Sequence, residues 1–292
     1  MNDAARPGTK IDEPTLRLIA AEAFDAFNGG GRHVQSFSAR HPQFTLDDAY
    51  RVTAFAHALR VAHGYKPLGR KIGFTNRRIW PEYNVYAPIW GYVYDRTTHD
   101  LAQALPLSPY SEPKIEPEIM FGLNSAPSPD LDDLGLLTCI AWVALGFEIV
   151  QSIFPAWKFS PADTVAADAL HAALLIGPRH AVRGREDEWL RTLSTFEIDL
   201  YRDGTLMDHG RATNVMEGPL STLRYLMELL ANDPANPPLA SGEIISTGTL
   251  TRALPCSVSE IWTATPKGIA LEDISLRFAA VNGGSGRKGV HG

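Results

Sequence analysis

The sequence predicts an α+β fold in which a helical N-terminal region precedes a mixed or antiparallel β-structure. Two observations lead to this prediction. Apolar residues keep a helical period early in the chain, and from about residue 68 the chain becomes a series of short apolar runs broken by Gly and Pro. Because the predicted strands do not alternate regularly with helices, a doubly wound parallel sheet is disfavoured.

Two helices are predicted in the first part of the chain. The first begins after Pro14 and keeps apolar residues at helical spacing up to Phe27. The second begins with Thr45 as its N-cap, which Asp48 follows three residues later, and ends at Gly64. A glycine run, 29–31, separates the two helices.

The remainder of the chain is predicted to be rich in strands. The candidate strands are 70–74, 116–123, 140–150, 172–176, 195–202, 243–247, 257–263 and 269–278, and one helix, 219–230, interrupts them. We therefore expect a helical region over 1–67, a β-domain over 68–280 and a disordered tail over 281–292. His209 is predicted to lie in a polar turn.

Composition limits the function classes. The 292 residues carry a net charge of −6, and no cluster of Lys and Arg relieves it, which argues against nucleic-acid binding. No apolar run approaches the roughly 18 residues of a membrane span, and the N-terminus lacks the pattern of a signal peptide. Two cysteines in apolar runs fit a reducing compartment. These features predict a cytoplasmic protein.

Three glutamates are the most informative residues. Glu116 and Glu118 would project from the same face of a strand, and Glu148 lies in an apolar stretch where a lone charge is costly. One divalent ion would compensate all three carboxylates, and oxygen ligands favour Mg²⁺ or Mn²⁺ over Zn²⁺. The alternative is an exposed edge strand with solvated glutamates and a Glu148 that pairs with an arginine.

A lysine lies at the end of the first predicted strand, in the run Lys71-Ile72-Gly73-Phe74-Thr75. Lys71 would reach into a pocket where Gly73 lets the backbone approach a ligand. Taken alone, the segment favours a solvent-facing Lys71.

The order of these segments resembles a known family. The lysine run, Ile115-Glu116-Pro117-Glu118-Ile119, Glu148-Ile149-Val150, Ala162-Asp163-Thr164 and the run 242–249 are similar to the 2-keto-4-pentenoate hydratase branch of the fumarylacetoacetate hydrolase family. That branch also contains the 4-oxalocrotonate decarboxylases of aromatic meta-cleavage pathways. The resemblance spans residues 15 to 280 and implies a compact mixed β-roll preceded by a smaller helical region.

The resemblance also implies roles for individual residues. Glu116, Glu118 and Glu148 become metal ligands, and Lys71 becomes an active-site lysine. Three residues are candidates for substrate binding: Thr75, Asp168 and Thr249. Two more are candidate catalytic groups: Lys158, which lies where related sequences place lysines, and His171, which as a lone histidine is more often a core residue.

Two departures from the family pattern bear on the reaction. Ile89 replaces an expected carboxylate, and Leu170 replaces an expected polar residue, so the pocket is predicted to be less polar than in a typical hydratase. The predicted reaction is addition of water to a 2-hydroxy-2,4-dienoate. The alternatives are a 4-oxalocrotonate-type decarboxylase and a non-catalytic partner subunit of such an enzyme.

We also expect a homo-oligomer that is able to associate with a pathway decarboxylase or hydratase. The aromatic run Trp80, Tyr83, Tyr86, Trp90, Tyr92 and Tyr94 is predicted to line a subunit interface or the mouth of the pocket.

Overall fold

A computed structural model describes residues 10–28 and 32–280 of the chain, and the side chains of Ile79, Glu82 and Tyr83 are outside this description. The predicted tail, 281–292, and the glycine run, 29–31, also lie outside the described residues. Within them, strands and helices are both abundant, as the α+β prediction requires.

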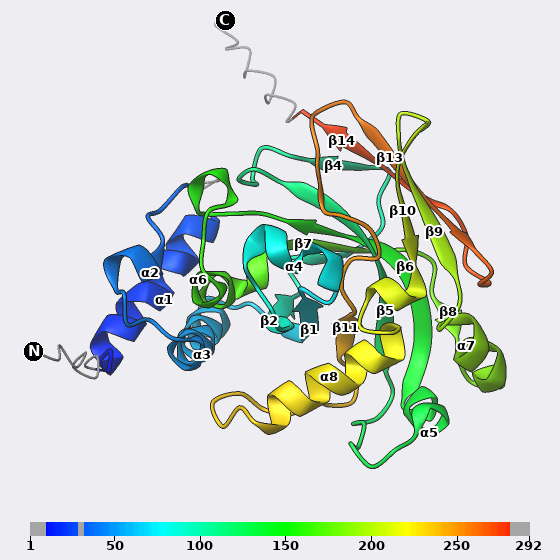
Figure 1. Ribbon diagram of the computed structural model, residues 1–292, viewed down its shortest axis with the longest axis horizontal. Helices are drawn as coiled ribbons and strands as arrows, with labels where there is room; N and C mark the ends of the chain where they lie inside the picture. Colours follow the sequence, from blue (N-terminus) through cyan, green and yellow to red (C-terminus); the bar gives the residue numbers. More distant parts are fainter. Residues whose placement is uncertain (1–9, 29–31, 281–292) are drawn as a thin grey trace, which may run out of the picture.

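Helices gather on one side of the molecule, beside the strands (Figure 1). They are α1 (Glu13–Asn28), α2 (Phe37–Arg40), α3 (Leu46–Ala62) and α6 (Pro161–Ala166). The predicted cap of α3 is confirmed, because the Thr45 hydroxyl accepts a hydrogen bond from the Asp48 backbone N–H and the Asp48 carboxylate accepts one from Thr45. Asp163 caps α6 in the same way with Ser160.

Helices α1 and α3 share an apolar core with residues 165–170, which follow strand β6 (Ile140–Val150) in the sequence. Leu16 and Ile19 of α1 pack in one cluster with Val52 of α3 and with Val165 and Leu170. The division into a region over 1–67 and a domain over 68–280 therefore stays a prediction, although the first strand does begin at Pro67.

Most strands belong to one mixed sheet of the described residues. Its order is β2 (Ile89–Tyr94), β1 (Pro67–Gly73), β11 (Ile244–Ser246), β5 (Lys114–Leu123), β6 (Ile140–Val150), β7 (His171–Ile176) and β3 (Thr98–Asp100), with β12 (Leu254–Pro255) pairing with β5 and β8 (His180–Ala181) pairing with β6. The pairs β1–β11 and β3–β7 are parallel, and the other pairs are antiparallel.

A smaller sheet flanks the first. Its order is β10 (Thr205–Arg211), β9 (Glu197–Arg202), β13 (Ile261–Lys267), β14 (Ile274–Ala279) and β4 (Ala104–Pro106). Inward residues such as Leu200, Ala264 and Leu276 join the main apolar core. The predicted mixed β-fold with a helical N-terminal portion is confirmed.

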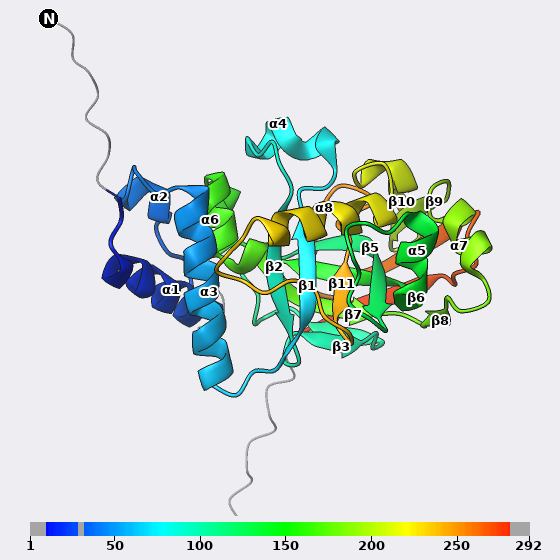
Figure 2. The same ribbon diagram turned by 90° about the horizontal axis from the view of Figure 1, so that it is seen from below.

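Helix α8 (Pro219–Ala231) matches the predicted helix and buries Leu220, Leu223 and Met227. Figure 2 shows it running across one face of the larger sheet. Among the described residues, five short α-helices were not predicted: α2 and α6, and also α4 (Trp80–Tyr83), α5 (Asp133–Thr138) and α7 (Glu186–Thr192). Each is too short to give a clear helical period in the sequence.

Two sequence predictions need correction. The polar turn expected around His209 is strand β10, an edge strand whose residues other than Gly210 are exposed or half-buried, and which lacks an apolar alternation. Trp90, Tyr92 and Tyr94 of β2 are buried in the chain's own core and do not form an exposed interface, and none of them lines the pocket beside the glutamates. They are covered by α3, from which His57 stacks on Tyr92 with ring centroids 3.9 Å apart.

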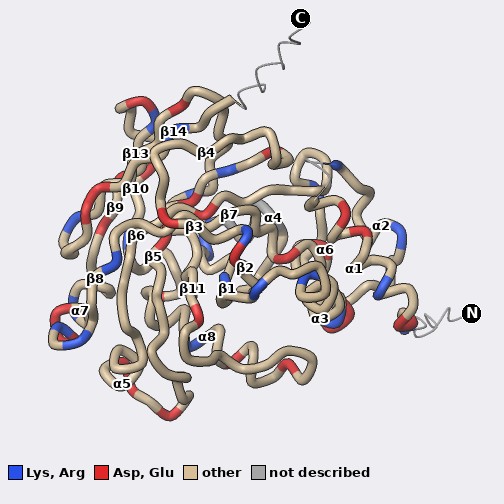
Figure 3. Tube along the Cα trace, turned by 180° about the vertical axis from the view of Figure 1, so that it is seen from behind, with Lys and Arg blue, Asp and Glu red and all other residues tan. Residues whose placement is uncertain are grey.

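Acidic and basic residues are interspersed along the trace, and no basic stretch dominates the side shown in Figure 3. Among the described residues, no helix combines the length and the apolar character needed to cross a bilayer.

Candidate metal centre

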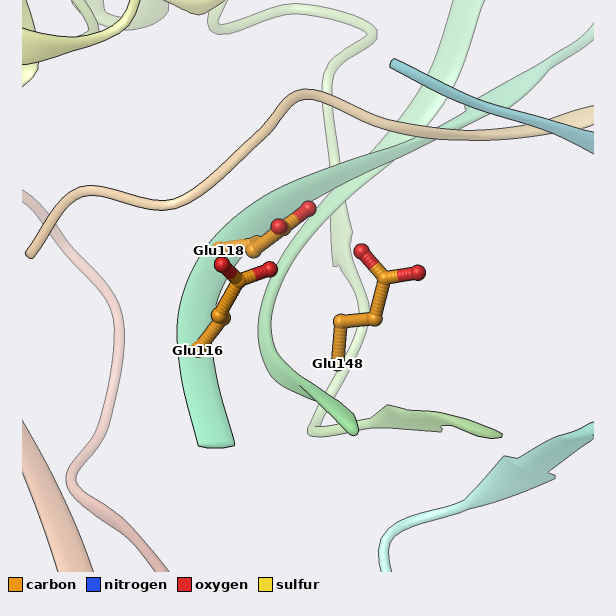
Figure 4. A group of neighbouring side chains, drawn as sticks. All are labelled: Glu116, Glu118 and Glu148. Carbon is orange, nitrogen blue, oxygen red and sulfur yellow. The ribbon is translucent and has the colours of Figure 1, made fainter. Parts of the chain in front are cut away.

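The three glutamates converge because of the register between β5 and β6. The two strands are antiparallel, and Glu116 lies directly opposite Glu148. Glu118 follows two residues later on β5 and therefore projects from the same face. One carboxylate oxygen from each residue lies within 4.8 Å of the others. Figure 4 shows the carboxylates directed into one common space between the strands.

The carboxylates are removed from water. Glu118 and Glu148 are fully buried, and Glu116 is 9% exposed. Burial, together with the neighbouring Glu118 carboxylate, holds the pKa of Glu116 well above its usual value. Burial and the Glu148 charge raise the pKa of Glu118 to about 8, and burial also raises the pKa of Glu148. Without a cation between them, the three groups therefore resist ionisation.

Glu118 is held by the segment after β11. Its Oε2 accepts hydrogen bonds from the Ser246 hydroxyl and from the Gly248 backbone N–H, the latter at 2.9 Å. Gly248 has φ of +91°, and a Cβ there would lie 1.8 Å from Thr75 Oγ1, so only glycine fits. The other oxygen, Oε1, is buried and has no hydrogen-bond partner among the described residues.

Glu148 is oriented by a histidine. His171 Nδ1 lies 2.8 Å from Glu148 Oε1, and its Nε2 lies 2.9 Å from the hydroxyl oxygen of Thr97. Burial lowers the pKa of His171 to about 3, so the imidazole is neutral and Nδ1–H donates to the carboxylate. This chain of hydrogen bonds fixes the carboxylate of Glu148 in the way that outer partners fix metal ligands.

Lys71 lies beside the same carboxylate. Its Nζ is 3.2 Å from Glu148 Oε2 and donates to the Ala169 carbonyl oxygen at 2.9 Å. Burial alone would lower the pKa of Lys71, but the carboxylates of Glu148, Glu116 and Glu118 raise it on balance. The side chain is therefore a buried ammonium ion, and the solvent-facing interpretation is wrong.

The residues present fit a divalent cation. A buried carboxylate oxygen without a partner is costly, and a bound ion would give Glu118 Oε1 the missing partner. The donors are all carboxylate oxygens, which suit hard cations. The prediction of a carboxylate cluster able to bind a metal is confirmed in this coarser form.

A small pocket of about 40 Å³, open to solvent, leads to this cluster. Lys71, Glu116 and Thr249 contribute its polar side chains, and its remaining wall is largely apolar: Phe74, Val150, Trp157, Ala169, Leu170 and Ala253. The Thr249 hydroxyl donates to the Thr251 carbonyl at 3.0 Å, as expected for a turn threonine. Leu170 contributes an apolar side chain to the wall, and Ile89 is buried; that the pocket is less polar than in a typical hydratase stays a prediction.

Besides the buried carboxylates Glu118 and Glu148, four predicted site residues do not line the pocket. The Thr75 hydroxyl is buried and donates to the Thr247 carbonyl at 3.3 Å. Asp168 is buried and paired with Arg60 at 3.2 Å. His171 contacts the metal-ligand candidate Glu148. Lys158 is exposed, and the structure does not bring it together with the cluster.

The sequence did not predict three groups that bind side chains of the site. The Ser246 hydroxyl donates to Glu118, the Thr97 hydroxyl contacts His171, and the Ala169 carbonyl accepts from Lys71. Ser246 lies within the motif run 242–249, which was the available signal, but its contact depends on the pairing of β11 with β5. Thr97 and Ala169 carry no signal of their own, because they contribute a common hydroxyl and a backbone atom.

Comparison with known proteins supports the resemblance seen in the sequence. No family model matches the chain. A 2-hydroxyhexa-2,4-dienoate hydratase of Comamonas testosteroni is 27% identical over 241 residues, which cover 82% of this chain and 89% of that protein. A 4-oxalocrotonate decarboxylase of a Pseudomonas species is 27% identical over 223 residues, which cover 73% of this chain and 82% of that protein.

A solved structure shows the same fold. The 4-oxalocrotonate decarboxylase from Pseudomonas putida G7, complexed with magnesium and adipate, superposes with a TM-score of 0.83 at 23% identity. The match covers 93% of this chain and 100% of that one. This chain is therefore similar in sequence to 2-keto-4-pentenoate hydratases and to a 4-oxalocrotonate decarboxylase, and it shares the fold of a solved 4-oxalocrotonate decarboxylase.

Proposed function

We propose that this chain is a metal-dependent hydratase that adds water to a 2-hydroxy-2,4-dienoate in the breakdown of aromatic compounds. The observation that carries the proposal is the cluster of three buried carboxylates beside a buried ammonium, at the inner end of a pocket. The relatives named as hydratases, which match most of the chain, support the same reaction.

Glu116, Glu118 and Glu148 would hold the ion, and Mg²⁺ or Mn²⁺ suits this set of oxygen donors. The magnesium in the related decarboxylase structure supports this choice. When bound, the ion supplies Lewis-acid stabilisation of the negative charge that develops on the C2 oxygen of a 2-oxo acid.

The chain's own residues bind and orient the substrate. The Lys71 ammonium adds a fixed positive charge at the inner end of the pocket, where it attracts the substrate carboxylate and stabilises an enolate oxygen. His171 stays neutral and keeps the Glu148 carboxylate in place. The wall formed by Phe74, Val150 and Leu170 would pack against the substrate chain and exclude water from it.

Decarboxylation of a 4-oxalocrotonate-type dicarboxylate is the second candidate, because a 4-oxalocrotonate decarboxylase is also 27% identical, over 73% of the chain. Both reactions place negative charge on the same oxygen, so the cluster serves either. A non-catalytic partner subunit fits less well, since a chain without a metal would have no reason to keep three buried carboxylates. A homo-oligomer, association with a pathway enzyme and a cytoplasmic location remain predictions.

The test uses purified protein with Mg²⁺ or Mn²⁺ and 2-hydroxypenta-2,4-dienoate, whose ultraviolet absorbance disappears on hydration. Glu116→Gln should abolish turnover while the circular dichroism spectrum stays unchanged. Glu228→Gln, at an exposed position on α8, is the matched control and should retain full activity. Undiminished turnover by Glu116→Gln would refute the ligand assignment. Release of carbon dioxide from a dicarboxylic dienoate, with no hydration of the monocarboxylate, would favour the decarboxylase.

A further inference from the structure

Three consecutive non-glycine residues before β7 adopt left-handed backbone conformations. Asp168, Ala169 and Leu170 have φ of +55°, +51° and +65°. Each residue with a side chain costs about 1–2 kcal/mol in this conformation. Such a run persists only where surrounding contacts hold it, and it is typical of functional sites.

This turn contacts the candidate active site at several points. The Ala169 carbonyl accepts the hydrogen bond from Lys71 Nζ, and both Ala169 and Leu170 line the pocket. His171, which contacts Glu148, follows immediately. The position of Lys71 therefore depends on the shape of the turn.

Backbone contacts hold one end of the turn. The Gln151 N–H donates to the Leu170 carbonyl at 2.9 Å, and Leu170 N–H donates to Ala167 at 3.0 Å. Gly91 on β2 approaches so closely that a Cβ there would lie 2.7 Å from the Asp168 carbonyl oxygen.

The helical region holds the other end. Arg60 of α3 lies 3.2 Å from Asp168 Oδ2, and both side chains are more than nine-tenths buried. The guanidinium also lies over three rings: Phe24 at 6.0 Å, Phe27 at 5.4 Å and Tyr94 at 5.1 Å. The rings pack around the guanidinium and hold it in place, so Asp168 has a cationic partner at a fixed position.

We propose that Arg60, acting through Asp168, is a positioning residue that keeps the turn 168–170 in its left-handed shape and so aligns the Lys71 ammonium with the substrate. The proposal rests on the proposed function, in which Lys71 meets the substrate. It gives the N-terminal helices a part in the site, although α3 contributes no side chain to the pocket wall.

Loss of the Arg60 cation frees Asp168 from its partner. The turn can then relax toward an ordinary right-handed or extended conformation, which moves the Ala169 carbonyl away from Lys71. The glutamates remain on β5 and β6, whose pairing does not involve the turn. Substrate orientation is thus affected far more than metal binding.

The experiment compares Arg60→Met and Arg60→Lys in the full chain. Arg51→Met is the matched control, because Arg51 lies on the same helix and pairs with Asp48 of that helix at 3.6 Å. Arg60→Met should lower kcat by about 10- to 100-fold, as expected for a misplaced catalytic group. The Kd of Mn²⁺ should stay within about threefold, because all ligands and His171 remain.

Two further measurements do not depend on turnover. Oxalate, which stands in for the 2-oxo acid head, should bind the Mn²⁺-loaded Arg60→Met protein about tenfold more weakly in calorimetry, since Lys71 no longer faces it. The Gln151 amide should exchange its hydrogen faster. Arg60→Lys, which keeps the charge, should restore part of kcat and of oxalate affinity.

Unchanged kcat and oxalate affinity in Arg60→Met would overturn the proposal, as would an equal loss in Arg51→Met. If Arg60→Met fails to fold, Asp168→Asn tests the positioning role instead, because asparagine tolerates the left-handed conformation and the substitution removes only the charge. An active Asp168→Asn protein with wild-type kcat would then refute the positioning role. Wild-type protein without any turnover of dienoates would instead refute the proposed function, while the oxalate and exchange measurements would still test the turn.

Discussion

The apo protein should become less stable as the pH rises, and Glu118→Gln should remove much of this loss. Burial and the neighbouring Glu148 raise the pKa of Glu118 from its usual 4.5 to about 8. The folded protein therefore holds this proton more tightly than the unfolded chain does. The stabilisation that comes from this proton is complete below about pH 4.5, and it is lost as the pH rises to about 8.

The magnitude follows from the width of that window. A pKa difference of one unit corresponds to about 1.4 kcal/mol. The rise from 4.5 to about 8 therefore corresponds to a loss of about 5 kcal/mol in the free energy of unfolding. The pKa of Glu116 is raised as well, which steepens the decline. In Glu118→Gln the amide oxygen can still accept from Ser246 and Gly248, and no charge remains to be buried.

The assay is urea unfolding of chelator-treated protein between about pH 5 and pH 8.5. Wild type should lose several kcal/mol over this range, whereas Glu118→Gln should lose clearly less. Mn²⁺ at about 100 times its Kd should then restore about 2.7 kcal/mol to wild type and nothing to the variant. The exposed Glu228→Gln control should follow wild type. A flat wild-type profile, or equal stabilisation of both proteins by Mn²⁺, would show that the carboxylates do not form one coupled site.

Three further predictions follow from the site. His171→Ala should weaken Mn²⁺ binding by about 10- to 100-fold in a titration, because Glu148 loses the group that orients it; unchanged affinity would contradict this role. Gly248→Ala should lower the unfolding free energy by at least about 2 kcal/mol, since its Cβ would collide with Thr75, whereas Gly204→Ala, with φ of +77° and open space, should cost about 1 kcal/mol. Lys71→Met should keep Mn²⁺ binding but lower kcat by about 10²–10³-fold, with Lys71→Arg intermediate; equal activity of all three proteins would exclude an electrostatic role for the ammonium.

The parts of the structure that the sequence predicted well depend on local pattern. The cap of α3 needs only Thr45 and Asp48, and the shared face of Glu116 and Glu118 needs only the two-residue period of a strand. Helix α8 is predicted equally well, because its apolar residues repeat over three turns. In each case the contacts lie within a few residues of one another.

The parts that failed depend on partners far away in the sequence. Strand β10 lies at the edge of its sheet, where its side chains are exposed or half-buried and show no apolar alternation. The aromatic residues of β2 looked like surface anchors because the sequence does not show that α3 covers them. Arg60 and Asp168 meet across more than 100 positions, and no local pattern joins them.

Lys71 shows why the site had to be assembled before any one residue could be interpreted. A buried ammonium is as costly as a buried carboxylate, so neither is expected without the other. Three carboxylates, one ammonium and one dication together are neutral, while His171 remains uncharged. Burial raises the pKa values of all three glutamates, and without the dication the neighbouring carboxylates raise those of Glu116 and Glu118 further. The charges therefore balance only when the three carboxylates, the Lys71 ammonium and the dication are counted together.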